Sequence, residues 1–543
     1  MINKSFCVKA VLFDFDGTLT EPGSLDFLHL KETMGCPPDA PILEFIEDLP
    51  TQSQRNDATM VLERFELEAA VNSKPNQGAE DVIFYLQSKK IPLGIITRNS
   101  LTSIKRAFHN FEKIDISDFD IIISRDTPVK PKPSGDGILL AAQTLKVNVK
   151  DMIIVGDYIF DIQAGQAAGS TSVFIDHGTS SGSPTIKSDF TIFSLNEIKK
   201  IVRLGLPLPM GKLPNDILEQ FLDRLNFQDP SVLINAGVGE DTAAVNIEPE
   251  EILVLKSDPI TFVTDSIGLY AVLINANDIA TSGATPRWLL TTLLFPEGIT
   301  ASGIWQVMHE LESVCRLRNI ALCGGHTEIT DAVTRPVVTG MLVGTVTKCD
   351  LIDKRDMKPG DRVLLTKAVA VEGTAIIATE FEKKLIELGM TEIEIEQCCQ
   401  FISSISILEE AKIAGRSKGV HAMHDVTEGG LSTALKELSI AGGHEIRVNM
   451  DRIPILPQTE KVCQLLGIHP LGLIGSGSLL ICCQKDETDR LLAGIREAGI
   501  DVTCIGEVLD AGRGIEAVNK DGPTNFPAFE ADEITRLFNQ EIA

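Results

Sequence analysis

Two aspartates stand two residues apart directly after an apolar run near the start of the sequence. The segment VLFDFDGTLT places Asp14 and Asp16 beyond the apolar residues 8–13, and Gly17 follows them. Side chains two apart on an extended segment point to the same side, so both carboxylates can face one substrate. One carboxylate can attack a phosphorus atom while its neighbour gives and takes a proton. Because two carboxylates beside a phosphate need a cation, the pair also predicts Mg²⁺, which shares carboxylate and phosphate oxygens.

Further polar residues with suitable chemistry follow along the first 200 residues. Thr97, in GIITRNS, ends an apolar run with a hydroxyl suited to a phosphate oxygen. Lys130, in VKPKP, supplies a cation, and Lys132 is the alternative in the same motif. Asp157 and Asp161, in VGDYIFDI, follow another apolar run. Their order along the chain predicts one site for a phosphate group and a metal ion.

The elements that must position these residues are short apolar runs separated by stretches of helical period. This alternation predicts an α/β fold, a Rossmann-like parallel sheet with helices on both faces. Ligands of such sheets bind at the carboxyl ends of the strands, where the polar residues stand. The polar helical stretch at about 24–77 is expected to form a small cap. The predicted strands are at 8–13, 91–96, 121–123, 152–155 and 172–175.

As an ordered set, these residues resemble the haloacid dehalogenase-like superfamily over about residues 5–200. The resemblance implies that Asp14 forms an aspartyl-phosphate and that Asp16 is general acid and then base. It also implies that Thr97 and Lys130 hold the transferred phosphoryl group. An aspartate at position 16 favours phosphatase or phosphotransferase chemistry over dehalogenation. The ligands that the resemblance implies for Mg²⁺ are the Asp14 carboxylate, the Asp16 backbone carbonyl and Asp157, with Asp161 in support.

The chain changes character after residues 204–213, where LGLPLPMGKLP breaks any helix. The sequence beyond this point is rich in glycine turns such as GVGED, TSGATP, CGGHTE and TEGGL. Acidic and amide side chains beside these turns could gather magnesium ions around a triphosphate. Since no GxxxxGK[ST] motif is present, metal ions would neutralise a nucleotide more than a lysine-bearing loop would. The candidate ATP and Mg²⁺ ligands are Asp241, Asp258, Asn277, Asp278, Glu328 and Asp425.

These segments together resemble the aminoimidazole ribonucleotide (AIR) synthase superfamily. The resemblance implies two α+β domains, at about 213–350 and 358–515, and a homodimer formed through the first of them. It also implies ATP bound in a cleft and transfer of its phosphate to an oxygen of a small molecule. The hydrogenase-maturation dehydratases are the nearest group, although the terminal cysteine of that group is missing from RLFNQEIA. The alternatives are a kinase of the thiamine-monophosphate kinase type and a non-catalytic, nucleotide-sensing dimerisation module.

Composition limits the remaining classes of function. The formal net charge of −27 repels phosphate backbones, so nucleic acid is not an expected partner. The apolar runs are shorter than the roughly 18 residues of a membrane span, and the 11 cysteines show no metal-ligand spacing. We expect a soluble cytoplasmic enzyme that acts on a small phosphorylated metabolite. The expected parts are 1–203, 213–350, 358–515 and a tail at 516–543.

Overall fold

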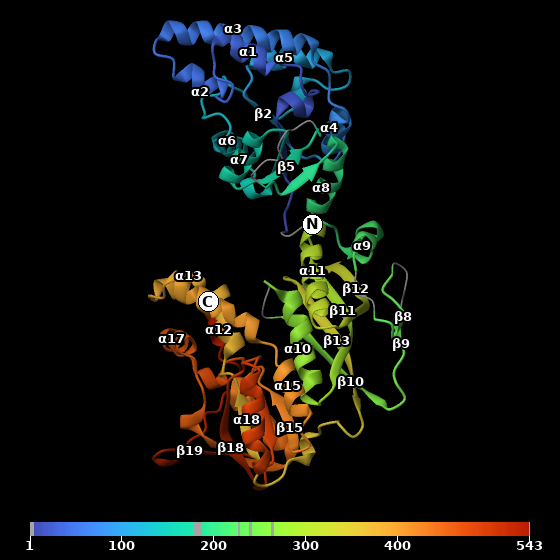
Figure 1. Cartoon of the computed structure of the whole chain (residues 1–543), viewed down its shortest axis with the longest axis vertical. Helices are drawn as coiled ribbons and strands as arrows, with labels where there is room; N and C mark the ends of the chain where they lie inside the picture. The colour runs from blue at the N-terminus through green and yellow to red at the C-terminus, as the bar shows by residue number, and fades with distance from the viewer. Residues whose placement is uncertain (1–4, 179–186, 226–228, 238–241, 262–264, 542–543) are drawn as a thin grey trace. The chain divides into compact units, whose positions relative to one another are not determined.

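The computed structural model describes residues 5–178, 187–225, 229–237, 242–261 and 265–541 (Figure 1). Its contacts divide the chain into two compact units, each of which is described by itself. The first unit is Met1–Pro209 with Glu297–Gln306, and the second is Met210–Pro296 with Val307–Ala543. The domain boundaries expected from the sequence, for the four parts 1–203, 213–350, 358–515 and 516–543, remain predictions.

The first unit is built on a parallel sheet of six strands in the order β3-β2-β1-β4-β5-β6, which confirms the predicted fold class. Its central strands are buried on both faces, as their unbroken apolar sequence requires. The strands are β1 (Ala10–Phe13), β2 (Leu93–Ile96), β3 (Ile121–Ile123), β4 (Met152–Gly156), β5 (Thr171–Ile175) and β6 (Phe190–Ile192).

Helices cover the two faces of this sheet. In β1, Val11 and Phe13 face one layer while Ala10 and Leu12 face the other, because successive side chains alternate. The first layer packs α4 (Ala79–Ser88), α5 (Leu101–Ala107) and α8 (Ile198–Gly205), and the second packs α6 (Asp136–Leu145) and α7 (Ile159–Ala168).

A helical cap is inserted between β1 and α4, where the sequence predicts one. The two linkers to the cap run side by side, and the Glu21 amide donates to the Lys74 carbonyl at 2.9 Å. The cap has a small core of its own around Leu30 and Leu62. Its helices are α1 (Phe27–Met34), α2 (Ile42–Glu47) and α3 (Gln52–Asn72).

The second unit begins with a five-stranded sheet in the order β10-β13-β11-β12-β7. Side chains alternate along β10, so that Lys256 and Asp258 lie on the face toward α10, whereas Leu253 and Leu255 lie exposed on the other. The elements of this part are β7 (Gly211–Lys212), α9 (Asn215–Leu222), β8 (Val232–Ile234), β9 (Ala244–Val245), β10 (Glu251–Ile260), α10 (Ile267–Thr281), β11 (Thr285–Pro296), α11 (Ala301–Leu317), β12 (Ala321–Thr330) and β13 (Val337–Thr347).

The rest of the second unit is a mixed seven-stranded sheet in the order β15-β17-β14-β18-β16-β19-β20. One face packs against α16 and the other against α15 and α18, and Ala280 of α10 joins that second layer. The expected tail contributes β19 and β20 to this sheet. The elements are β14 (Arg362–Thr366), α12 (Val371–Glu380), α13 (Glu382–Glu387), α14 (Glu392–Cys399), α15 (Leu408–Gly415), β15 (Val420–Asp425), α16 (Gly430–Gly442), β16 (His444–Asn449), α17 (Pro457–Leu466), β17 (Leu479–Cys483), α18 (Thr488–Glu497), β18 (Val502–Ala511), β19 (Ile515–Asn519), β20 (Gly522–Thr524) and α19 (Thr535–Glu541).

Within the part of the chain that the structure describes, no helix combines the length and the apolar character that crossing a bilayer requires.

Candidate functional site

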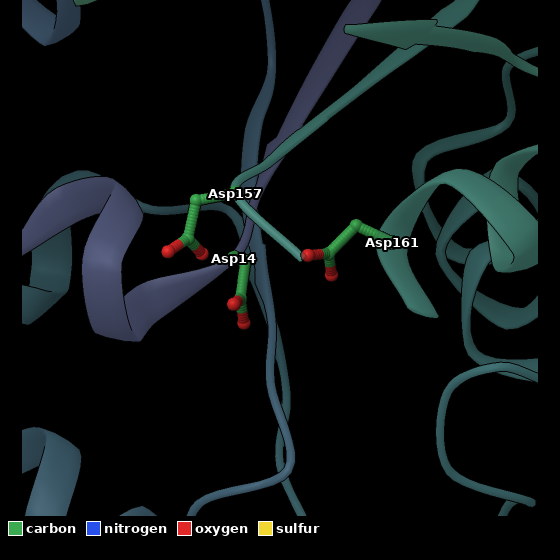
Figure 2. Close-up of side chains that lie close together, drawn as sticks. All are labelled: Asp14, Asp157 and Asp161. Atoms are coloured by element: carbon green, nitrogen blue, oxygen red, sulfur yellow. The ribbon is translucent and has the colours of Figure 1, made fainter. Parts of the chain in front are cut away.

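Three carboxylates meet at the carboxyl edge of the parallel sheet. Asp14 follows β1, Asp157 follows β4, and Asp161 lies in the first turn of α7. One oxygen of each lies within 4.8 Å of the others, and Figure 2 shows the three side chains turned toward a common space. This spacing suits a single divalent cation, since Mg²⁺ takes carboxylate oxygens as ligands.

Two glycines make this close approach possible. Gly17 has φ of 75°, and a Cβ there would lie 2.0 Å from Oδ2 of Asp157. A Cβ on Gly156 would lie 2.2 Å from the carboxyl carbon of Asp161. Any larger residue at either position would push the carboxylates apart.

Lys132, rather than Lys130, supplies the cation of the site, which corrects the first choice made from the sequence. Its ammonium donates to Oδ1 of Asp14 at 2.6 Å and to Oδ1 of Asp161 at 2.5 Å. Burial alone would lower the pKa of Lys132, but the two carboxylates outweigh it and raise that pKa. Lys130 is exposed and lines a different hollow, so the alternative within KPKP is the residue that the fold brings in.

Asp16 faces the same cavity as Asp14 and is held by an amide. The side chain of Asn99 donates to Oδ2 of Asp16 at 2.6 Å. Burial raises the pKa of Asp16 to about 6, although the Asn99 hydrogen bond acts to lower it. A carboxyl with such a pKa can both donate and accept a proton near neutral pH.

The acidic cluster carries more negative charge than its lysine neutralises. Burial, with Asp14 and Asp161 nearby, raises the pKa of Asp157 to about 8. Such a shift means that the neighbouring donors do not offset the cost of burying the charged form, and a divalent cation beside these oxygens would. The donor set therefore fits the Mg²⁺ that the sequence predicts.

Thr97 lies at the end of β2, where the sequence places it. Its hydroxyl accepts a hydrogen bond from the backbone amide of Asn99 at 3.2 Å. Thr97, Asp14 and Asp16 line a cavity of about 390 Å³ between the cap and the sheet edge. Two ion pairs join cap and core beside it, Arg98 with Glu44 and Arg125 with Glu66.

A second acidic cluster lies in the second unit. The ammonium of Lys256 lies 2.9 Å from Oδ2 of Asp258 and 2.9 Å from Oδ2 of Asp278. Asp425, at the end of β15, lies against Asp278, and burial together with that neighbour raises the pKa of Asp425 to about 8. Its buried Oδ2 receives no hydrogen bond from any described residue. A buried carboxylate oxygen that accepts no hydrogen bond is destabilised, and a bound cation would stabilise it.

Two of the predicted nucleotide ligands do not join this cluster. The buried side chain of Asn277 donates to the Ile405 carbonyl at 2.8 Å and accepts the Ile407 amide at 3.0 Å, so it fastens α10 to the following domain. Glu328 faces His326 on β12, three strands from β10, or roughly 14 Å across the sheet. Asp241 lies outside the described residues.

Models of known families match three stretches of the chain. The haloacid dehalogenase-like hydrolase model matches residues 11–175. The models for the N-terminal and C-terminal domains of AIR synthase related proteins match residues 239–346 and 358–519. The first domain belongs to the haloacid dehalogenase-like hydrolases, and the rest of the chain matches the models of AIR synthase related proteins. Its hydrolase domain carries the first acidic cluster, and its AIR synthase related module carries the second.

Curated relatives resemble the two parts separately. An uncharacterized hydrolase of Saccharomyces cerevisiae is 30% identical over 199 residues, which are 36% of this chain and 90% of that protein. The carbamoyl dehydratase HypE of Cupriavidus necator is 29% identical over 286 residues, which are 51% of this chain and 78% of that protein. The crystal structure of E. coli HypE shares the fold of the AIR synthase related module, with a TM-score of 0.50 and 22% identity over 58% of this chain and 97% of that one.

Sequence reasoning missed two residues that the structure brings into these clusters. Asn99, in the hydrolase domain, stands two residues after Thr97 in the quoted motif, and its amide is the kind of group that holds a carboxylate. Lys256, in the AIR synthase related module, precedes Asp258 by two residues on one strand, which is the spacing that puts both on the same face. That alternation was the signal that could have identified it.

Proposed function

We propose that the hydrolase domain is a Mg²⁺-dependent phosphomonoesterase with Asp14 as its nucleophile. The observation that carries the proposal is the meeting of Asp14, Asp16 and Lys132 at one cavity. A carboxylate oxygen of Asp14 attacks phosphorus, and the bond from phosphorus to the alcohol oxygen breaks as Asp16 donates its proton to that oxygen. Asp16 then takes a proton from water, whose oxygen displaces Asp14 and releases inorganic phosphate.

The other side chains of the site orient the nucleophile, contact the phosphoryl group or would bind the metal ion. Lys132 keeps the Asp14 carboxylate oriented, and Thr97 offers its hydroxyl to a phosphoryl oxygen. The residues that would hold the metal are Asp14, Asp157 and the Asp16 backbone carbonyl, with Asp161 beside them. When bound, Mg²⁺ would neutralise charge on the phosphoryl oxygens in the transition state.

The test compares Asp14→Asn with Asp39→Asn, a change on the exposed surface of the cap. Phosphate release from an aryl phosphate with Mg²⁺ should fall by several orders of magnitude in the first variant and stay within twofold in the second. Intact-protein mass after acid quench should show a phosphoryl adduct on the parent and on Asp39→Asn, but not on Asp14→Asn. Activity of Asp14→Asn within tenfold of the parent would contradict the assignment.

We also propose that the AIR synthase related module binds ATP with Mg²⁺ and transfers its phosphate to a small-molecule oxygen. The supporting observation is the group of Asp258, Asp278 and Asp425, in which one carboxylate oxygen has no donor. Likeness to a carbamoyl dehydratase over most of that relative's length favours activation of an oxygen atom. Asp241 is included among the proposed ATP and Mg²⁺ ligands because of its position in the GVGED segment.

Ligand-dependent stability tests this second proposal. Mg²⁺ with ATP should raise the melting temperature of the full chain, since a ligand that binds only the native state stabilises it. Asp278→Asn should remove that shift, while Asp331→Asn, in the exposed loop between β12 and β13, should retain it. ADP release with candidate acceptors would then separate turnover from binding. No shift in the parent at millimolar ATP would exclude a nucleotide site.

The exposed face of the first sheet in this module supports the proposal of a homodimer through residues 213–350. Leu253 is 43% exposed, Leu255 61% and Met341 45%, and all lie on the face of β10 and β13 opposite α10. Water-exposed apolar side chains gathered on one sheet face are typical of a surface that a partner covers.

A further inference from the structure

The cavity above Asp14 is larger than a phosphate group requires. Its volume is about 390 Å³, and liquid water occupies about 30 Å³ per molecule, so the cavity holds on the order of a dozen waters. The leaving group of the substrate therefore also lies inside it. The walls around that space determine which leaving groups fit.

Part of the cavity wall is apolar and aromatic. The cap contributes Phe27, Leu43 and Leu62, and the loop and helix after β4 contribute Tyr158 and Phe160. Phe27 is 52% exposed and Tyr158 is 58% exposed, although both border the cavity. A ligand that covered these rings would remove apolar surface from water, which is the main source of affinity in such cavities.

The charged side chains of the cavity leave little attraction for a second anionic group. Among the described residues that line it, three are basic. Each basic side chain has a partner within the protein: Lys132 with Asp14, Arg98 with Glu44, and Lys31 with a backbone carbonyl of the cap. A carboxylate on the leaving group would have to displace one of these partners to gain a cation.

We propose that the hydrolase domain acts on phosphate monoesters of neutral alcohols that carry an aromatic or broad apolar group, and discriminates against esters whose alcohol bears a carboxylate or a second phosphate. The inference rests on the proposed phosphatase function. Phe27, Leu43, Tyr158 and Phe160 are the specificity-determining residues, because they contact the leaving group and not the phosphorus.

Benzyl phosphate and phosphoglycolate form a matched pair of probes. Both place the phosphate on a CH₂–O group, and they differ in a phenyl ring against a carboxylate. With the full chain and Mg²⁺, kcat/KM for benzyl phosphate should exceed that for phosphoglycolate by at least about tenfold. Acetyl phosphate has a small leaving group that does not need to contact the apolar walls. Its hydrolysis therefore measures attack by Asp14 separately from recognition of the leaving group.

The three probes separate the two proposals. If the parent hydrolyses acetyl phosphate but prefers phosphoglycolate, or treats the pair alike, the substrate class is wrong and the phosphatase stands. If the parent hydrolyses none of the three, the phosphatase proposal itself fails. Faster turnover of benzyl phosphate supports both.

A variant pair tests the cap wall. Leu43→Arg should lower the ratio of benzyl phosphate to phosphoglycolate kcat/KM by at least about fivefold, because it adds a cation where a ring would pack. Leu28→Arg makes the same change at a cap residue that is 69% exposed and outside the cavity, and should leave the ratio within twofold. Because the ratio compares two substrates of one sample, any unfolded fraction cancels. Equal effects of the two variants would refute the assignment of Leu43.

Discussion

The ammonium of Lys132 lies 2.6 Å from Oδ1 of Asp14, a residue 118 positions earlier in the chain. The same ammonium reaches Asp161, so one buried lysine bridges the end of β1 and the start of α7. Lys130, two residues away in the same motif, has no part in this arrangement because its side chain is exposed. The pair of lysines is therefore a natural comparison for measuring what the buried charge contributes.

Lys132→Ala should lower kcat/KM for an aryl phosphate by about 100-fold or more, since removal of one stabilising donor at a phosphoryl or oxyanion site commonly costs that much. Lys130→Ala should stay within about twofold of the parent. Phosphate release under identical Mg²⁺ concentrations measures both. The reverse pattern would return the role to Lys130.

The stability of the AIR synthase related module should depend on pH through Glu372. Burial raises the pKa of this carboxyl from 4.5 to about 7, and its Oε2 accepts the Ser476 amide at 3.1 Å. The folded state binds this proton more tightly than the unfolded chain does. The contribution of Glu372 to the free energy of unfolding is thus fully present below about pH 4.5 and is lost as the pH rises through about 7.

Glu372→Gln should therefore raise the melting temperature at pH 8, because it adds up to about 3 kcal/mol to the free energy of unfolding there. At pH 4.5 it should change the melting temperature little. Glu382→Gln, an exposed change on α13, is the control and should have no pH-dependent effect. Thermal unfolding followed by circular dichroism at the two pH values measures the difference. A destabilised Gln variant at pH 8 would show that the charged form has an unrecognised partner.

Lys256 should make the thermal stability of the AIR synthase related module less dependent on Mg²⁺. Its ammonium pairs with Asp258 and Asp278, so Lys256→Met would leave two partly buried like charges together. In EDTA the variant should melt several degrees below the parent, and millimolar Mg²⁺ should recover most of the loss. Lys418→Met removes an exposed ion pair with Asp350 and should show no recovery by Mg²⁺. The melting temperatures, with and without the ion, give the comparison.

Leu255→Glu should convert the proposed dimer to a monomer. The residue is 61% exposed on the outer face of β10, and a charge there would be buried by a partner sheet. Leu317→Glu, at a residue that is 74% exposed at the end of α11, is the matched control. Sedimentation velocity of both variants and the parent measures the change, and a parent that sediments as a monomer would exclude this interface.

Much of the hydrolase domain can be predicted from sequence alone, because its strands are local features. An apolar run such as that before Asp14 can be satisfied only when both faces are buried, which predicts a parallel sheet. The carboxyl ends of parallel strands share one edge, so Asp14, Thr97 and Asp157 had to lie near each other. The helical cap was likewise predictable from the polar helical stretch between the first two strands.

Tertiary structure alone decided which of two neighbouring candidates faces each site. The motif KPKP offers two lysines, and only the packing of its loop against residues more than a hundred positions earlier selects Lys132 over Lys130. On α10, Asn277 and Asp278 are adjacent and therefore point about 100° apart, so just one of them can join Lys256. The sequence determined that these residue types and strand ends exist, because periodicity and motifs are local. The side-chain direction within a loop, and the face that a buried helix turns toward its neighbour, depend on contacts between segments distant in sequence, which the local pattern does not contain.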